Sequence, residues 1–179
     1  TIMTTPTTMI MEVGGMAEGV ALLRLLWLAS PALPIGAYGY SRGLEYAVDC
    51  GWVHDADSAR GWIEGVLERQ VAMLDLPVLA RLHAAFSAEA SDEVERWSTF
   101  LCAARESAEV ALEDRQLGHA LTRVLREAGV PAAQPADRAW PYATAFALAA
   151  VHWEIAREDA LLAYALAFVE AQVTAASKL

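Results

Sequence analysis

The chain has 179 residues, a formal net charge of −10 and a sequence pI of about 4.8, and 56% of its residues are hydrophobic. This length predicts one domain, and the acidic balance argues against binding to nucleic acids or to an anionic membrane surface. The high apolar fraction indicates a large core, or a surface that is buried against a partner.

The predicted elements are helical throughout, because Ala, Leu, Glu and Arg dominate and no alternating β-branched runs occur. Residues 1–15 carry no Lys or Arg and no long apolar run, so we expect a disordered leader rather than a secretory signal. The all-helical domain is assigned to residues 16–179. Its first helix is expected over 16–28, and a short second helix over 41–49, with Gly51 as its C-terminal stop.

A third helix is expected to begin at Asp55 or Asp57 and to end near Met73, and Asp75 is expected to cap a fourth helix that ends near Ser87. The later helical regions are expected over 91–127, 141–153 and 158–177. The sequence leaves open whether residues 91–127 form one helix or two. The pattern therefore predicts an all-α, single-domain bundle of about seven or eight helices.

Several apolar segments are expected in the interior of this bundle. The run ALLAYALAFV at 160–169 predicts a central helix that is buried on all sides, or one that also contributes to a dimer seam. Trp27, Trp52 and Trp62 are expected in the core. The longest uncharged stretch, 139–153, is shorter than the roughly 20 residues that span a bilayer, so no membrane segment is expected.

Two stretches carry the strongest functional signal. The first, LLRLLWLASPALPIGAYGYSRGLE at 22–45, interrupts an apolar run with prolines and glycines that restrict its backbone path, and its tyrosines suit an interface. The second, RESAEVALEDRQLG at 105–118, should place Glu106, Glu109 and Glu113 on one helix face, with Arg105 paired to Glu109. This face is either a solvated acidic surface or a contact surface.

Residues suited to catalysis or metal binding are poorly represented. No P-loop sequence occurs, and the four histidines and two cysteines show no spacing typical of a metal site. Cys50 and Cys102 lie far apart and are expected to be reduced thiols in a cytosolic protein. We therefore expect no catalytic residue, no bound metal and no cofactor.

Both stretches resemble the urease accessory protein F family, whose signatures are close to LxLASPxLPIGAYSYSxGLE and RExxELxxEDRQxG. The chain departs from the first at Gly39, where the family often has serine, and at Arg42, where it often has glutamine. The segments 142–153 and 164–179 resemble the family's late helices. The resemblance implies another helix and a polar tail past the Lys178-Leu179 position, and we expect this chain to lack them.

The resemblance implies a cytoplasmic homodimer that joins the urease accessory D/H protein and the accessory GTPase. It also implies that the assembly inserts nickel into apo-urease in a GTP-dependent manner. The partner-binding residues expected on these grounds are Pro34, Gly36, Tyr38, Tyr40, Ser41, Gly43, Leu44, Glu45, Arg105, Glu106, Glu109, Glu113, Asp114 and Arg115. Some of them are expected to act as intramolecular braces between the loop and the helix.

Two other functions are considered. A GTPase-activating protein would insert an arginine finger, for which Arg42 is the nearest candidate. A small-molecule enzyme or carrier would need a closed pocket with converging polar groups, of which the sequence gives no sign.

Overall fold

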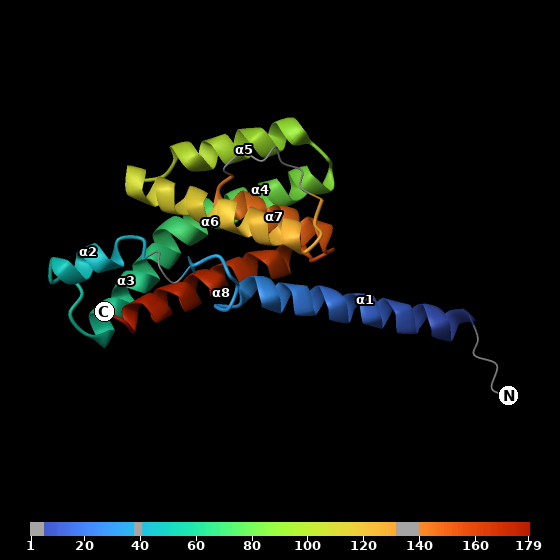
Figure 1. Cartoon of the computed structure of the whole chain (residues 1–179), viewed down its shortest axis with the longest axis horizontal. Coiled ribbons are helices and arrows are strands. Elements are labelled where there is room, and N and C mark those ends of the chain that lie inside the picture. The colour runs from blue at the N-terminus through green and yellow to red at the C-terminus, as the bar shows by residue number, and fades with distance from the viewer. Residues whose placement is uncertain (1–5, 38–40, 132–139) are drawn as a thin grey trace.

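The computed structural model describes residues 6–37, 41–131 and 140–179, with side chains described from residue 18 onward. Its elements are α1 (Pro6–Ala29), α2 (Leu44–Asp49), α3 (Ala56–Val66), the π-helix η2 (Leu67–Asp75), α4 (Leu76–Ser87), α5 (Ser91–Ala103), α6 (Ala108–Glu127), α7 (Tyr142–His152) and α8 (Arg157–Ala176). These described residues contain no strand, so the predicted all-α fold is confirmed. Helices α4 to α7 pack together, α8 runs alongside them against α1, and α2 and α3 lie beside the C-terminal part of α8 (Figure 1).

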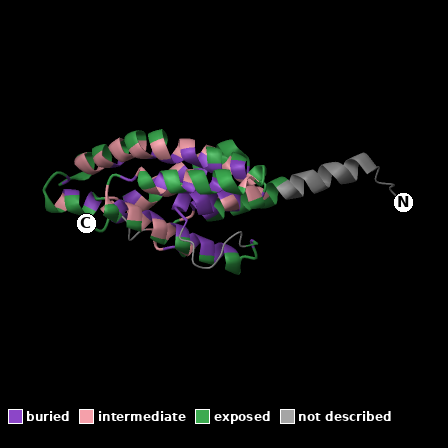
Figure 2. Ribbon diagram, turned by 90° about the horizontal axis from the view of Figure 1, so that it is seen from above, coloured by how far each residue is buried: buried purple, intermediate pink, exposed green. Residues whose placement is uncertain are grey.

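The core is centred on α7, which packs against both α4 and α6. Most residues of α7 are buried, because its many alanines let the neighbouring helices approach closely, and the fully buried Phe146 packs edge to face on Tyr164 of α8. Figure 2 shows the buried residues gathered along the middle of the molecule. The expectation that residues 141–153 form a helix buried against other helices is thereby confirmed.

The contact between α6 and α7 depends on Gly118. A Cβ atom at this position would lie 1.9 Å from the carbonyl oxygen of Trp140 and 2.7 Å from the carbonyl carbon of Pro141. Both are backbone atoms, so no side-chain rotation could relieve the clash. Gly118 therefore lets the start of α7 lie directly on α6.

Helices α3 and α4 form one continuous helical segment joined by the π-helix, which corrects the expected break at Asp75. The N–H of Leu76 bonds to the carbonyl of Val71, five residues back, rather than to the carbonyl four residues back as in an α-helix. The next residue, Pro77, has no N–H and makes no such bond. Asp75 has helical backbone angles and its side chain caps nothing. The carboxylate is instead fully buried inside the bundle.

The region 91–127 divides into α5 and α6, which answers the question the sequence left open. The break lies at 104–107, and the Ser107 side chain caps α6 by accepting the N–H of Val110. Helix α1 begins at Pro6, ten residues before the expected start, and so overlaps the stretch where a disordered leader was expected. Residues 1–5 lie outside the described part of the chain.

Helix α8 is not buried on every side, which corrects that expectation. Leu162 and Leu166 are 70% and 49% exposed. Tyr164, which lies between them in the sequence, points to the opposite face of the helix and is buried. Among the described residues, α8 is the one helix long and apolar enough to cross a membrane by length and composition. It packs against α1, α4 and α7, and 33% of its apolar window is buried inside the bundle.

Candidate functional site

The centre of the candidate site is a buried network of four charged side chains. The two carboxylates are Asp75 of η2 and Asp114 of α6, and the two guanidinium groups belong to Arg42, which precedes α2, and Arg105, which lies between α5 and α6. At least nine-tenths of each of these four side chains is inaccessible to solvent. The network therefore ties together four segments that are far apart in the sequence.

Arg105 makes the most extensive contacts in this network. Its Nη2 donates to Asp75 Oδ1 and to Asp114 Oδ2, each at 2.7 Å, and its Nε donates to Asp114 Oδ2 at 3.0 Å. The planar guanidinium suits such forked contacts, which a lysine could not reproduce. The predicted pairing of Arg105 with Glu109 is therefore wrong, because Arg105 precedes α6 and turns into the bundle.

Asp75 accepts hydrogen bonds from three side chains. Besides Arg105, these are Arg42 Nη1 at 3.2 Å and the hydroxyl of Tyr164 at 3.2 Å. Burial alone would raise the pKa of Asp75, but the charge of Arg42 and the hydrogen bonds and charge of Arg105 outweigh it and lower that pKa. Asp75 is therefore a carboxylate that is held ionised in the interior.

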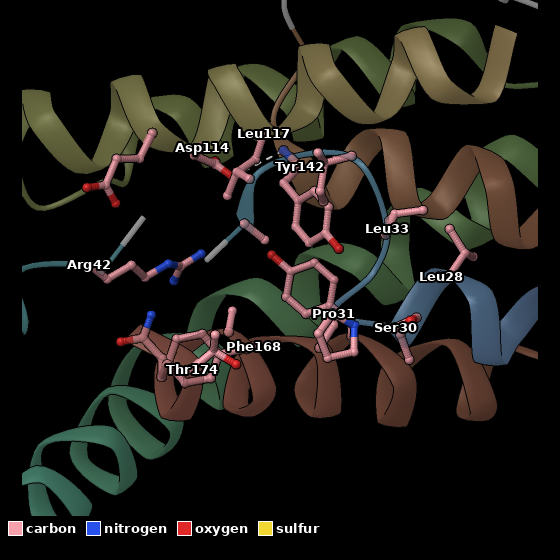
Figure 3. Close-up of a pocket in the computed structure, with 18 of the residues that line it drawn as sticks. Leu28, Ser30, Pro31, Leu33, Arg42, Asp114, Leu117, Tyr142, Phe168 and Thr174 are labelled. Carbon is pink, nitrogen blue, oxygen red and sulfur yellow. Dashed lines mark hydrogen bonds between the residues drawn. The ribbon is translucent and has the colours of Figure 1, made fainter. Parts of the chain in front are cut away.

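Arg42 connects the loop between α1 and α2, which we call the signature loop, to this network. Its guanidinium enters a cavity of about 180 Å³, with Asp114 of α6 on one side and Phe168 of α8 on the other (Figure 3), and its Cζ lies 5.5 Å from the Phe168 ring centre. The backbone of Arg42 has a φ of 45°, a conformation that is strained for a residue with a side chain. Arg42 thus makes its ion pair with Asp75 from a backbone conformation that few residues with a side chain adopt.

Asp114 also fixes the start of α7. Its Oδ1 accepts the backbone N–H of Tyr142 at 3.1 Å, while its Oδ2 accepts the two bonds from Arg105. This carboxylate therefore links the α5–α6 connection to α7 as well as to the signature loop. The buried residues Arg105 and Asp114 are intramolecular braces of the kind that the sequence led us to expect.

The loop residues predicted for partner binding divide into buried and exposed groups. Ser41 is buried and its Oγ accepts the N–H of Glu45 at 3.3 Å, Gly43 uses a φ of 83° that favours glycine, and Leu44 is fully buried. Pro34 and Glu45 are exposed. Gly36 is half-buried with a φ of 71°, and Tyr38 and Tyr40 lie outside the described residues.

The predicted residues around the start of α6 also divide. Glu109 is exposed, Glu106 is exposed and accepts Nε2 of Gln70 at 2.6 Å, and Arg115 is half-buried. Glu106 precedes the N-cap residue Ser107, so it does not share a helix face with Glu109 and Glu113 as predicted.

Glu113 shows how closely the loop and α6 approach. Burial raises its pKa and the nearby charges of Glu45 and Glu106 raise it further, whereas the backbone N–H of Arg42 and the charge of Arg42 oppose that rise. Glu45 and Glu106 therefore each lie close enough to Glu113 to act on its charge, although the three residues come from separate segments. We call these three carboxylates, together with Glu109 in the first turn of α6, the loop–α6 surface, in which Glu45 stands in the first turn of α2, directly after the loop.

The sequence reasoning missed Asp75 and Tyr164. Asp75 precedes Leu76-Pro77 and resembled a helix cap, and Tyr164 lies in a run that is otherwise apolar. Two arginines inside apolar surroundings require carboxylate partners, but only the fold shows which carboxylates reach them. Trp27 and Trp52 were expected in the core and are instead 36% and 60% exposed, and Trp62, expected there as well, is half-buried.

The described residues show no group of three or more His, Cys, Asp or Glu side chains that could hold a metal ion. Cys50 and Cys102 are both free thiols. The buried arginines and carboxylates satisfy one another, so the network has the character of a structural brace.

Comparison with known proteins agrees with this description. The UreF family model matches residues 53–179. A protein of Teredinibacter turnerae named urease accessory protein UreF is 50% identical over 163 residues, which cover 88% of this chain and 72% of that protein. Proteins of the same name from Alkalilimnicola ehrlichii and Hahella chejuensis are 47% and 40% identical, over 90% and 89% of this chain and 72% of each relative. The chain therefore belongs to the UreF family of urease accessory proteins.

Proposed function

We propose that this chain acts as a non-catalytic adaptor in urease maturation. In this proposal a cytoplasmic homodimer joins the accessory D/H protein to the accessory GTPase, and the assembly inserts nickel into apo-urease. Membership of the UreF family supports the urease-related role. The observation that carries the adaptor role is the loop–α6 surface together with the buried ion pairs of the neighbouring residues Arg42 and Arg105.

A surface held in one conformation loses little entropy when a partner binds. Arg42 fixes one side of the loop–α6 surface and Arg105 fixes the other, and both donate to Asp75. The exposed side chains Glu45 and Glu109 therefore stand on backbone that is already ordered. Their negative charges suit a basic face on the partner.

An adaptor can influence GTP hydrolysis without contributing a catalytic group. It needs only to bind one nucleotide state of the GTPase more tightly than the other, which shifts the population toward that state. The arginine-finger alternative is less well supported, because the Arg42 side chain is 10% exposed and already paired with Asp75.

The experiment is a pull-down of the purified accessory GTPase and the purified accessory D/H protein. The Glu45→Lys/Glu109→Lys variant reverses one exposed charge in the first turn of α2 and one in the first turn of α6. We expect this variant to capture less of at least one partner. The control, Asp92→Lys/Glu127→Lys, makes the same charge change on exposed residues at the start of α5 and the end of α6. Equal capture by both variants and the wild type would refute the assignment of this surface.

A further inference from the structure

A second surface lies on α2 and the turn that follows it, where two large aromatic side chains face solvent. Tyr46 is 63% exposed and Trp52 is 60% exposed, yet their rings pack edge to face with centroids 5.7 Å apart. Trp52 also lies against Trp62, with ring centroids 6.5 Å apart. We call these three side chains the aromatic platform.

The platform stands on rigid backbone. The N–H groups of Trp52 and Val53 both bond to the carbonyl of Ala47, at 2.8 and 3.1 Å, and Gly51 makes the turn with a φ of 73°. Beneath it, Leu44 and Ala47 are fully buried in a small hydrophobic cluster of their own. The exposure of Trp52 is therefore a property of the folded structure.

The charge around the platform is strongly negative. Residues 44–66 contain five carboxylates and one arginine, Arg60. The hydrogen bonds that Asp55 accepts from the side chain and backbone of Ser58 lower the pKa of Asp55, which keeps it ionised. Aromatic faces attract cations, and neighbouring carboxylates strengthen that attraction.

The chain's own arginines cover other aromatic rings. Arg81 and Arg96 lie 4.9 and 4.5 Å from the ring centre of Trp97, and Arg24 lies 5.5 Å from that of Trp153. In the part of the chain that the structure describes, no guanidinium group lies over Tyr46 or Trp52. The platform is thus an aromatic surface in an acidic setting without the cation that its chemistry favours.

We infer that the aromatic platform of Tyr46, Trp52 and Trp62 binds an arginine- or lysine-bearing segment of a partner protein. Exposed tryptophan and tyrosine residues often dominate the energetics of protein interfaces. The acidic surroundings select a basic segment and would repel another copy of the same acidic surface. This inference concerns aromatic side chains that are not part of the loop–α6 surface, although Glu45 belongs to the acidic surroundings of both, and it can be tested on the chain alone.

The test titrates the intact chain with a blocked hexapeptide of alternating Arg and Gly, with a Glu–Gly hexapeptide as the charge control. We expect the indole N–H resonance of Trp52, assigned by its loss in Trp52→Leu, to shift saturably with the arginine peptide only. Trp52→Leu should weaken peptide binding about threefold to tenfold, the range typical of one cation–π contact. Phe100→Leu, which removes another exposed ring, should leave the affinity unchanged.

Three results would overturn the inference. The first is a wild-type chain that does not bind the arginine peptide. The second is a Trp52→Leu variant that binds it as tightly as the wild type, since binding would then reflect net charge alone. The third is a change of oligomeric state in Trp52→Leu, measured by light scattering, which would assign this surface to a second copy of the chain.

Discussion

The close contact between α6 and α7 at Gly118 gives the sharpest stability prediction. In Gly118→Ala the new methyl group would lie 1.9 Å from the carbonyl oxygen of Trp140, whereas ordinary contact begins near 3.4 Å. The start of α7 would have to move away from α6 by about 1.5 Å. Because Tyr142 belongs to that segment, its 3.1 Å hydrogen bond to Asp114 would lengthen or break.

The magnitude follows from three contributions. Overpacking a well-packed interface costs about 1–3 kcal/mol, and losing a hydrogen bond to a charged group costs about 1.5–3 kcal/mol. Alanine gains back about 1 kcal/mol over glycine in helix propensity. We therefore expect Gly118→Ala to lower the free energy of unfolding by about 2–5 kcal/mol.

The assay is urea unfolding followed by circular dichroism, with Gly61→Ala as the matched control. Gly61 is an exposed residue within α3, and a Cβ there would have no neighbour within 4 Å. That variant should be as stable as the wild type or more stable by up to about 1 kcal/mol. If Gly118→Ala unfolds at the same urea concentration as Gly61→Ala, the inferred contact between α6 and α7 is refuted.

Two further predictions concern the charge network. Arg105→Met should lower the free energy of unfolding by about 3–5 kcal/mol in the same assay, because it leaves Asp75 and Asp114 buried without their main partner; a loss below about 1 kcal/mol would contradict the network. The pKa of Asp75 is lower in the folded state than in the unfolded state. Its ion pairs therefore contribute fully to the free energy of unfolding above the unfolded-state pKa of about 3.9, and this contribution is lost as the pH falls through the folded-state pKa. Urea unfolding between pH 7 and pH 2.5 should therefore show a steep loss of stability below about pH 4 in the wild type and a shallower one in Asp75→Asn. The same dependence of stability on pH in both proteins would contradict the ionised state assigned to Asp75.

Much of the fold could be predicted because local signals determine it. The alanine-rich sequence between Tyr142 and His152 identified a buried helix, and Gly51 identified the end of α2. Where the sequence failed, a long-range contact was responsible. Asp75 has the local context of a helix cap, but it ends a π-helix that continues directly into α4. Two distant arginines pair with its carboxylate in a buried network.

The candidate site shows the same division. The motifs located the loop and the start of α6, because their glycines, prolines and charges are visible in the sequence. The motifs could not show that Arg105 points inward while Glu109 points outward, since both lie near the N-terminus of one helix. The exposure of Trp52 was likewise unpredictable, because it depends on how α2 packs on the rest of the bundle.

The central claim is that Arg42 and Arg105, by sharing Asp75, hold the loop–α6 surface in the conformation that partners bind. The most direct measurement is the affinity of the Arg42→Leu variant, which removes every donor to Asp75 from this position, for the accessory GTPase and the accessory D/H protein. Asp75 keeps Arg105 and Tyr164 in this variant, so the fold should survive. We predict binding about tenfold weaker with unchanged helix content, in line with the loss of a pre-ordered surface. Unchanged affinity in a folded Arg42→Leu protein would contradict the account.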